Sequence, residues 1–120
     1  MEKRLLVIQE HHAKRAGLHW DIRFEHNNDN VKVLRSFVIP KHEFPEFGKV
    51  RMAILVDDHD WSYKDFDGQI ESGYGEGRVK LLYSDYINVS EYSCDKINFQ
   101  FNDKWYTIFR TNKNFLIKQL

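Results

Sequence analysis

The chain has 120 residues and a formal net charge of zero, with 18 basic and 18 acidic residues. This length predicts one domain spanning residues 1–120. Neutrality disfavours a protein that coats or slides along nucleic acid, but it is compatible with an enzyme that grips one terminal phosphate. A lone cysteine, Cys94, excludes an internal disulfide. With no signal peptide and no membrane-length apolar run, we expect a cytoplasmic protein.

Short runs of alternating, β-branched and aromatic residues recur along the chain and predict strands. The expected strands are Leu5–Gln9, Leu18–Glu25, Val31–Ile39, Arg51–Val56, Arg78–Tyr83, Lys96–Phe101, Trp105–Arg110 and Phe115–Leu120. Turn residues join two pairs of them, at His26–Asn30 and at Asn102-Asp103. This pattern predicts an all-β, mainly antiparallel fold: a single small, closed or nearly closed β-barrel of about eight strands.

Two segments between the fourth and fifth expected strands do not fit a strand pattern. Residues Trp61–Phe66 are expected to form one short helical turn. The glycine-rich run Gly68–Gly77 is predicted to be a loop, because glycine allows backbone angles that other residues avoid. No helix pattern follows its glycines, so we favour a strand-connecting turn over a phosphate-binding loop.

The second expected strand carries a histidine and an aspartate on one face. His19 and Asp21 are two residues apart, roughly 7 Å along the backbone, so both side chains can lean onto one metal ion. His11, at the end of the preceding strand, supplies a third ligand if the intervening loop folds back. Two imidazoles and a carboxylate suit manganese, iron or zinc better than calcium and leave positions open for water or substrate. From spacing alone, a solvated polar face fits equally well.

A second polar segment comes at the end of the fourth expected strand. Arg51, Asp57 and His59 share strand parity, so they are expected on one face. If that face meets the face of His19, the pocket holds several cations beside a metal, which suits a phosphate group. Lys41 can add another cation. Without the neighbouring motifs, ordinary surface charge would be the preferred interpretation of Lys41 and Arg51.

Six segments occur together in a fixed order over roughly residues 5–85 of the chain. They are Gln9–Arg15, Leu18–Glu25, Leu34–Lys41, Met52–His59, Tyr63–Gly68 and Gly73–Gly77. Together they resemble the 3′-phosphoesterase domain of bacterial ligase D and its free-standing bacterial and archaeal relatives. The resemblance implies a β-barrel hydrolase that uses manganese, or another divalent transition metal, to remove a 3′-phosphate and leave a 3′-hydroxyl for repair or ligation. The family can also remove a terminal ribonucleotide.

The resemblance also implies roles for particular residues. The expected metal ligands are His11, His19 and Asp21. The expected ligands of the scissile phosphate are Arg23, Arg51 and His59. Further catalytic positions, with roles left open, are Lys41, Asp57 and Tyr63. His59 can either hydrogen-bond the phosphate or protonate the leaving 3′-oxygen.

The implied partner is a nucleic-acid 3′ end, in a primer–template or nicked DNA. A separate DNA ligase or polymerase is a further expected partner, and the chain is expected to be a monomer without membrane contact. Two alternatives stay open. A barrel that binds a nucleic-acid end without cleaving it is the first. A non-haem iron oxygenase, with His19, Asp21 and the distant His59 as its two-His, one-carboxylate site, is the second.

Overall fold

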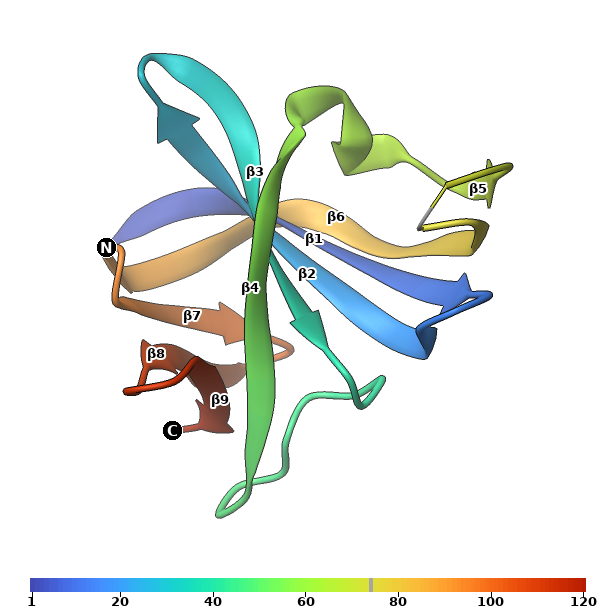
Figure 1. Cartoon of the computed structure of the whole chain (residues 1–120). Helices are drawn as coiled ribbons and strands as arrows, with labels where there is room; N and C mark the ends of the chain where they lie inside the picture. The colour runs from blue at the N-terminus through green and yellow to red at the C-terminus, as the bar shows by residue number, and fades with distance from the viewer. Residues whose placement is uncertain (74) are drawn as a thin grey trace.

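A computed structural model describes residues 1–73 and 75–120, so Tyr74 of the expected glycine-rich loop lies outside the described residues. Within that part the chain forms nine strands and the short 3-10 helix η1, Trp61–Asp65 (Figure 1). The strands are β1 (Glu2–Ala13), β2 (Gly17–Asn28), β3 (Val31–Ile39), β4 (Val50–Asp60), β5 (Gly68–Ile70), β6 (Gly77–Tyr92), β7 (Lys96–Phe101), β8 (Lys104–Arg110) and β9 (Phe115–Gln119). Among these residues, no helix has the length and apolar character needed to cross a membrane.

Eight of the described strands close into an antiparallel barrel. Their hydrogen-bonded order is β1-β2-β3-β4-β9-β8-β7-β6, and β6 returns to pair with β1 along the whole of β1. Strand β5 pairs with the first residues of β6 and stays outside the closed ring. Closure removes the unpaired edges that an open sheet would expose. The predicted all-β, antiparallel barrel is therefore confirmed.

Each expected strand is present, but β1, β2, β4 and β6 are longer than the sequence pattern indicates. Strand β1 continues to Ala13 because its second half pairs with β2 on one side and β6 on the other. The helical turn is confirmed as η1. The prediction that Gly68–Gly77 is entirely a loop is wrong, because Gly68–Ile70 forms β5 by pairing with β6.

The two turns expected from asparagine and aspartate are confirmed. Asp29 and Asn30, between β2 and β3, have φ angles of 49° and 66°. Asn102 and Asp103, between β7 and β8, have φ angles of 50° and 63°. Asparagine and aspartate tolerate this left-handed conformation, which two-residue hairpin turns need to match the strand twist.

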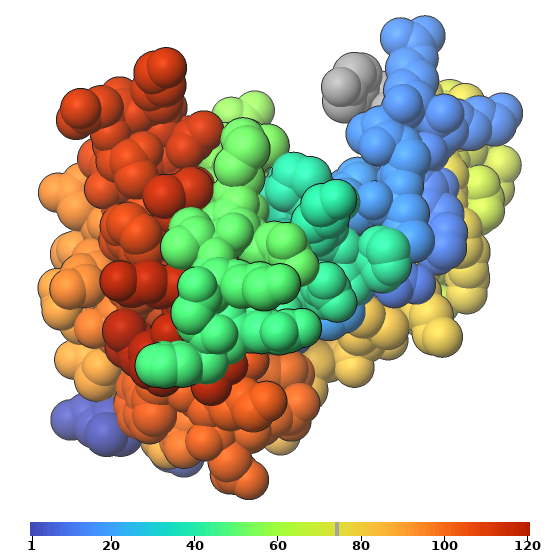
Figure 2. Space-filling view, turned by 90° about the horizontal axis from the view of Figure 1, so that it is seen from below, coloured from blue at the N-terminus to red at the C-terminus, as the bar shows by residue number. Residues whose placement is uncertain are grey.

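Large apolar side chains fill the interior of the barrel. The core includes Leu6, Ile8, Ile22, Phe24, Phe37, Phe99, Ile108 and Ile117, all fully buried. Each contributes about 1.5–3 kcal/mol by leaving water. Figure 2 shows the β3–β4 connection, in teal and green, lying across the lower end between the red C-terminal strands and the blue β1–β2 hairpin. Phe44 of this connection packs on the core and closes that end.

A second, smaller apolar cluster lies on the outer face of the barrel under η1. Leu5 and Val7 of β1 pack there with Leu34 of β3. On β1 these residues alternate with core residues, so the odd-numbered positions of this strand face outward. Gln9 and His11 therefore share the outer face, and they begin the polar site described below.

Gly77 allows β6 to start close against β1 beside that site. A Cβ at this position would lie 2.1 Å from the carbonyl oxygen of His12, and φ is 146°, in the region that favours glycine. Gly77 pairs with Ala13, at the point where β1 and β6 begin to close the barrel. A side chain here would push the two strands apart.

Candidate functional site

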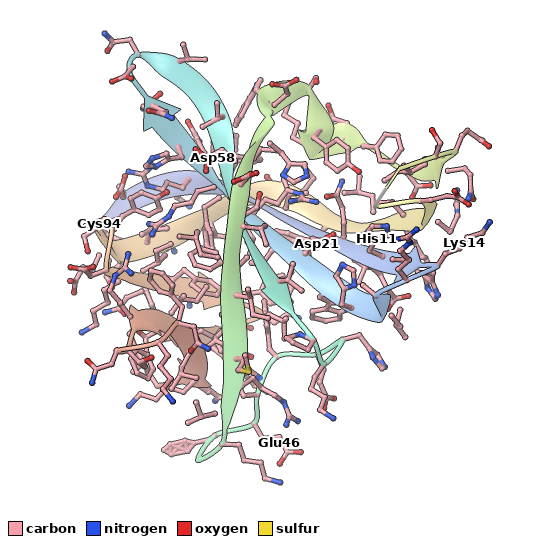
Figure 3. All side chains as sticks on the ribbon, viewed as in Figure 1. His11, Lys14, Asp21, Glu46, Asp58 and Cys94 are labelled. Atoms are coloured by element: carbon pink, nitrogen blue, oxygen red, sulfur yellow. The ribbon has the colours of Figure 1, made fainter. Side chains whose placement is uncertain are left out.

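Strands β1 and β2 bring three potential metal ligands together on the outer face. His11 lies directly opposite His19 in the strand register, and Asp21 is two residues farther along β2 on the same side. One ligand atom from each residue lies within 4.8 Å of the others. Figure 3 shows His11 and Asp21 side by side, with Lys14 farther out at the hairpin tip. The condition stated for His11 is met, because the turn at residues 14–16 folds β2 back onto β1 and places His11 opposite His19.

His12 takes no part in this cluster. Its side chain is exposed, and its Nε2 lies 3.1 Å from Oε1 of Glu10. Alternation along β1 explains the difference, since neighbouring residues of a strand point to opposite faces.

A backbone carbonyl sets the tautomer of His11. Its Nε2 lies 2.8 Å from the carbonyl oxygen of Gly75. Since a carbonyl only accepts, Nε2 carries a proton and donates it, so Nδ1 is the ring atom that faces Asp21, at 3.6 Å. Nδ1 can bond the carboxylate when it is protonated and can bind a metal ion when it is not. Metal-binding histidines commonly donate their second ring N–H to a carbonyl or carboxylate in this way.

Asp21 is only 5% exposed but stays ionised. Its carboxylate lies 3.2 Å from Nε2 of His19 and 3.3 Å from Nη2 of Arg23. Burial alone would raise the pKa of Asp21, but hydrogen bonds with His11 and His19 and the charge of Arg23 outweigh burial and hold that pKa well below its usual value. The same contact with Asp21 raises the pKa of His11, against the effect of burial.

These donors fit a divalent first-row metal ion. Two imidazole nitrogens and one ionised carboxylate converge at the end of a cavity. The bond from Nε2 of His11 to Gly75 leaves Nδ1 as the ring atom that faces the shared space. Such a set binds manganese, iron or zinc and leaves positions open.

Arg23 connects this cluster to the rest of the pocket. Its guanidinium donates from Nε to Oε1 of Gln9 at 2.7 Å and from Nη1 to Nδ1 of His59 at 3.1 Å, while Nη2 faces Asp21. The Tyr63 ring lies 5.0 Å from its Cζ atom. One N–H on each terminal nitrogen has no partner among these contacts, and Arg23 lines the cavity. Burial lowers the pKa of Arg23, which nevertheless keeps its charge.

His59 reaches the pocket through a register shift in β4. Ser36 of β3 pairs with Val56, but Leu34 pairs with His59, so one residue of β3 faces two of β4. Such a bulge breaks the alternation of the strand. His59 therefore lines the same cavity as Val56, whereas Asp57 does not.

His59 is neutral near pH 7. Burial, followed by the charge of Arg23, lowers the pKa of His59 below its ordinary value. Its Nδ1 lies near the carbonyl oxygen of Asp57 as well, at 3.2 Å. Because Arg23 always keeps its protons, Nδ1 accepts from it and Nε2 carries the imidazole proton. His59 is thus a hydrogen-bond donor at Nε2.

These groups line one end of a cavity of about 480 Å³. Tyr63 of η1 forms part of this polar end, and burial raises its pKa. Apart from Gly75, the other described lining residues are aliphatic: Ala13, Ala16, Leu18, Val38, Pro40, Ile54, Val56 and Ile70. A pocket of this size and lining accepts a small organic group with its charged part at the polar end.

Three residues of the expected site lie outside this cavity lining. The Nη2 of Arg51 donates to Oε1 of Glu43 at 2.9 Å, and Lys41 is exposed beyond Pro40. Asp57 is exposed and borders a separate cavity. The single face expected for Arg51, Asp57 and His59 does not form, because the register shift of β4 separates His59 from the other two. Their catalytic roles stay predictions.

Sequence reasoning did not single out three contributors to the site. Gln9 is fully buried and accepts a hydrogen bond from Arg23. Its position two residues before His11, at the end of an apolar run, could have indicated that it faces the same site. Ser36 is fully buried beside His59, with its Oγ 3.4 Å from Nδ1. The carbonyl of Gly75 could not be found from side-chain patterns, because any residue supplies one.

Comparison with known proteins identifies a family whose model matches most of this chain. The family model described as the DNA ligase D 3′-phosphoesterase domain matches residues 9–108. That range includes the ligand cluster on β1 and β2 and also Arg23, His59 and Tyr63.

Three similar proteins are named multifunctional non-homologous end joining protein LigD. The one from Mycobacterium bovis is 37% identical over 90 residues, covering 74% of this chain and 11% of that protein. The one from Mycolicibacterium smegmatis is 43% identical over 76 residues, covering 62% and 9%, and the one from Pseudomonas aeruginosa is 38% identical over 73 residues, covering 60% and 8%. This chain thus spans about a tenth of the length of these relatives. The chain belongs to the DNA ligase D 3′-phosphoesterase domain family.

Proposed function

We propose that this chain is a divalent-metal-dependent phosphoesterase that removes a 3′-phosphate from a nucleic-acid end and leaves a 3′-hydroxyl. The observation that carries the proposal is the buried cluster of His11, His19 and Asp21, which opens into the same cavity as Arg23 and His59. The family supports 3′-phosphoesterase chemistry. The names of the relatives refer to end joining, which supports DNA ends as substrates. Removal of a terminal 3′-ribonucleotide is proposed as a second activity of the same site.

The metal would be held by His11, His19 and Asp21, and we propose manganese as the ion. When bound, such an ion neutralises charge on a phosphate oxygen and lowers the pKa of a coordinated water. The ionised state of Asp21 supports this use of the cluster, because metal ligands must be deprotonated at the ligating atom. The bond from Nε2 of His11 to Gly75 supports it as well, because it leaves Nδ1 as the atom that faces the cluster.

Arg23 would bind the phosphate through one N–H group on each terminal nitrogen. These are the two groups that its contacts with His59 and Asp21 do not use. Gln9 and Asp21 already hold its guanidinium plane, so little side-chain freedom is lost when a ligand binds. A planar guanidinium matches two oxygens of a phosphate, and a bond between charged groups in a buried site is stronger than one in water.

His59 would donate a hydrogen bond from Nε2 to a phosphate oxygen or to the leaving 3′-oxygen. Its contact with Arg23 at Nδ1 makes Nε2 the donor atom of the neutral ring. An arriving phosphate raises the pKa of a neighbouring imidazole, so His59 would take up a proton from water and, as imidazolium, return it to the leaving oxygen as the bond breaks.

The aliphatic part of the cavity would contact the sugar and base of the terminal nucleotide. Side chains such as Val38 and Ile54 offer neither donors nor acceptors to base edges. We therefore propose action on any terminal base, with a separate ligase or polymerase using the 3′-hydroxyl that remains.

The test is phosphate release from a primer–template that carries a 3′-phosphate. A second substrate of identical sequence with a 5′-phosphate serves as the matched control. Manganese should support release from the 3′-phosphate alone, and a chelator should stop it. Binding without release over a range of divalent metals would favour the silent end-binding barrel. An absolute need for ferrous iron and oxygen would favour the oxygenase, although His59 contacts Arg23 instead of joining His19 and Asp21.

A further inference from the structure

Gln9 is a fully buried polar residue of β1, and it directly follows the buried apolar residues 5–8 of that strand. It lies opposite Asp21 in the β1–β2 register and is 0% exposed. A buried amide is costly unless its donors and acceptor are bonded. Its Oε1 accepts from Nε of Arg23 at 2.7 Å, and its Nε2 donates to the carbonyl oxygens of Tyr63 at 3.1 Å and Phe66 at 3.0 Å.

The acceptor end of this amide fixes the plane of Arg23. The bond to Nε is the shortest of the guanidinium contacts described above, as expected for a charge-assisted hydrogen bond. Because Nε and the two terminal nitrogens lie in one rigid plane, anchoring Nε also directs the terminal N–H groups. Those groups reach Asp21 on one side and His59 on the other.

The donor end ties the segment after β4 to the wall of the barrel. Tyr63 lies within η1 and Phe66 directly follows it, and their rings stack with centroids 4.8 Å apart. The Tyr63 ring in turn lies 5.0 Å from the ring of His59. One amide therefore links the guanidinium on β2 to the aromatic side of the pocket.

We propose that Gln9 is a positioning residue, which sets the direction of the Arg23 guanidinium and fixes Tyr63 relative to it. Gln9 is not among the described residues that line the cavity, so it acts through Arg23 and does not touch substrate. Its effect on catalysis rests on the proposed function, but its effect on Arg23 does not.

Two substitutions separate the two ends of the amide. Gln9→Met keeps the length of the side chain and removes both the acceptor and the donors. Gln9→Glu keeps an acceptor for Arg23 and removes the donors to Tyr63 and Phe66. Gln100→Met is the matched control, because Gln100 also bonds a side chain, that of Asn88, but lies on β7.

The first readout is the NMR signal of the Arg23 Nε–H group in each folded variant. In the unmodified chain and in Gln9→Glu this proton should exchange slowly with water, because a partner holds it in a buried site. In Gln9→Met the slow exchange should be lost, and in Gln100→Met it should be kept. An unchanged signal in Gln9→Met would overturn the proposal, whatever the enzymatic activity.

The second readout is steady-state kinetics on the 3′-phosphorylated primer–template. Gln9→Met should lower kcat by about ten- to a hundredfold, the size expected when a charged hydrogen-bond donor loses its alignment. Manganese affinity should stay within about threefold. Gln9→Glu should recover part of kcat. Equal losses in Gln9→Met and Gln100→Met would overturn the proposal in favour of a general effect on folding. If the unmodified chain releases no phosphate, the proposed function fails while the NMR result still decides the role of Gln9.

Discussion

Two arginines expected to hold phosphate differ in what surrounds their guanidinium groups. Arg23 is 3% exposed and contacts Asp21, Gln9 and His59. Arg51 pairs with Glu43, whose side chain is 63% exposed. Exposed ion pairs of this kind are weak, so Arg51 can leave Glu43 easily, whereas Arg23 cannot leave its place.

Substituting the two arginines should therefore give unequal losses. Arg23→Ala is expected to lower kcat at least about a hundredfold, because it removes a buried donor aligned with the cavity. Arg51→Ala should cost about tenfold or less, mainly in KM, and leave manganese affinity unchanged. Phosphate-release kinetics with metal titration measure both, and melting curves serve as the folding control. Full activity in Arg51→Ala would remove it from the site, and a larger loss than in Arg23→Ala would contradict the geometry.

Manganese affinity should depend on pH through His11. A proton and a metal ion compete for its Nδ1, and the contact with Asp21 raises the pKa of His11 above its ordinary value. As the pH falls through that raised pKa, His11 gains a proton and affinity falls by about tenfold per pH unit. Asp21 stays ionised over this range because its pKa is lowered.

Calorimetric titration with manganese between pH ~8 and ~5.5 measures this dependence. The His12→Ala variant is the control, since His12 is exposed and bonded to Glu10. It should follow the same curve as the unmodified chain. A flat affinity over the whole range would show that His11 is not a ligand.

At the scale of elements, closure of β1 against β6 depends on Gly77. Gly77→Ala places a Cβ against the His12 carbonyl in a conformation that other residues avoid. Gly48→Ala is a matched control, because φ there is also positive, at 88°, but nothing lies within 4 Å. The control should lose about 1–2 kcal/mol of unfolding free energy, and Gly77→Ala clearly more. Chemical denaturation of both variants measures the difference, and equal losses would contradict the close approach.

The strands and turns also show how much of the fold can be predicted from the sequence. Alternation placed His19 and Asp21 on one face of β2, and turn residues located two hairpins. Backbone irregularity escaped prediction, because the register shift opposite Arg35 leaves no mark in residue types. The short strand β5 escaped as well, since Gly68–Ile70 pairs with β6 through backbone groups alone.

For the site, residue types and spacing identified the cluster but not the contacts that hold it. The prediction that Arg23 binds the scissile phosphate did not include its protein partners, because only tertiary packing brings Gln9 and His59 to it. The expected face for Arg51 rested on unbroken alternation along β4. That assumption fails at the bulge, where a local change in backbone pairing decides which side chain reaches the cavity.

At the scale of the whole molecule, zero net charge limits the number of nucleic-acid phosphates that the chain can bind at once. Each phosphate neutralised by the protein adds about −0.7 to −0.9 to the slope of log affinity against log salt. We expect a slope between zero and about −3, which corresponds to a few phosphates near the 3′ end. Binding measured against salt concentration checks this. A slope of about −6 or steeper would require an extended contact with the backbone.

In the proposed function, phosphate release depends on the ligand cluster of β1 and β2, which is formed by His11, His19 and Asp21. Asp21→Asn keeps the shape of the side chain and removes its charge, and a melting curve confirms that the variant folds. The direct measurement compares this variant with the unmodified chain on a 3′-phosphorylated primer–template with manganese. We predict manganese-dependent release by the unmodified chain and a loss of at least about a thousandfold in Asp21→Asn, with weakened metal binding. Release by Asp21→Asn at the unmodified rate would contradict the metal-centred mechanism.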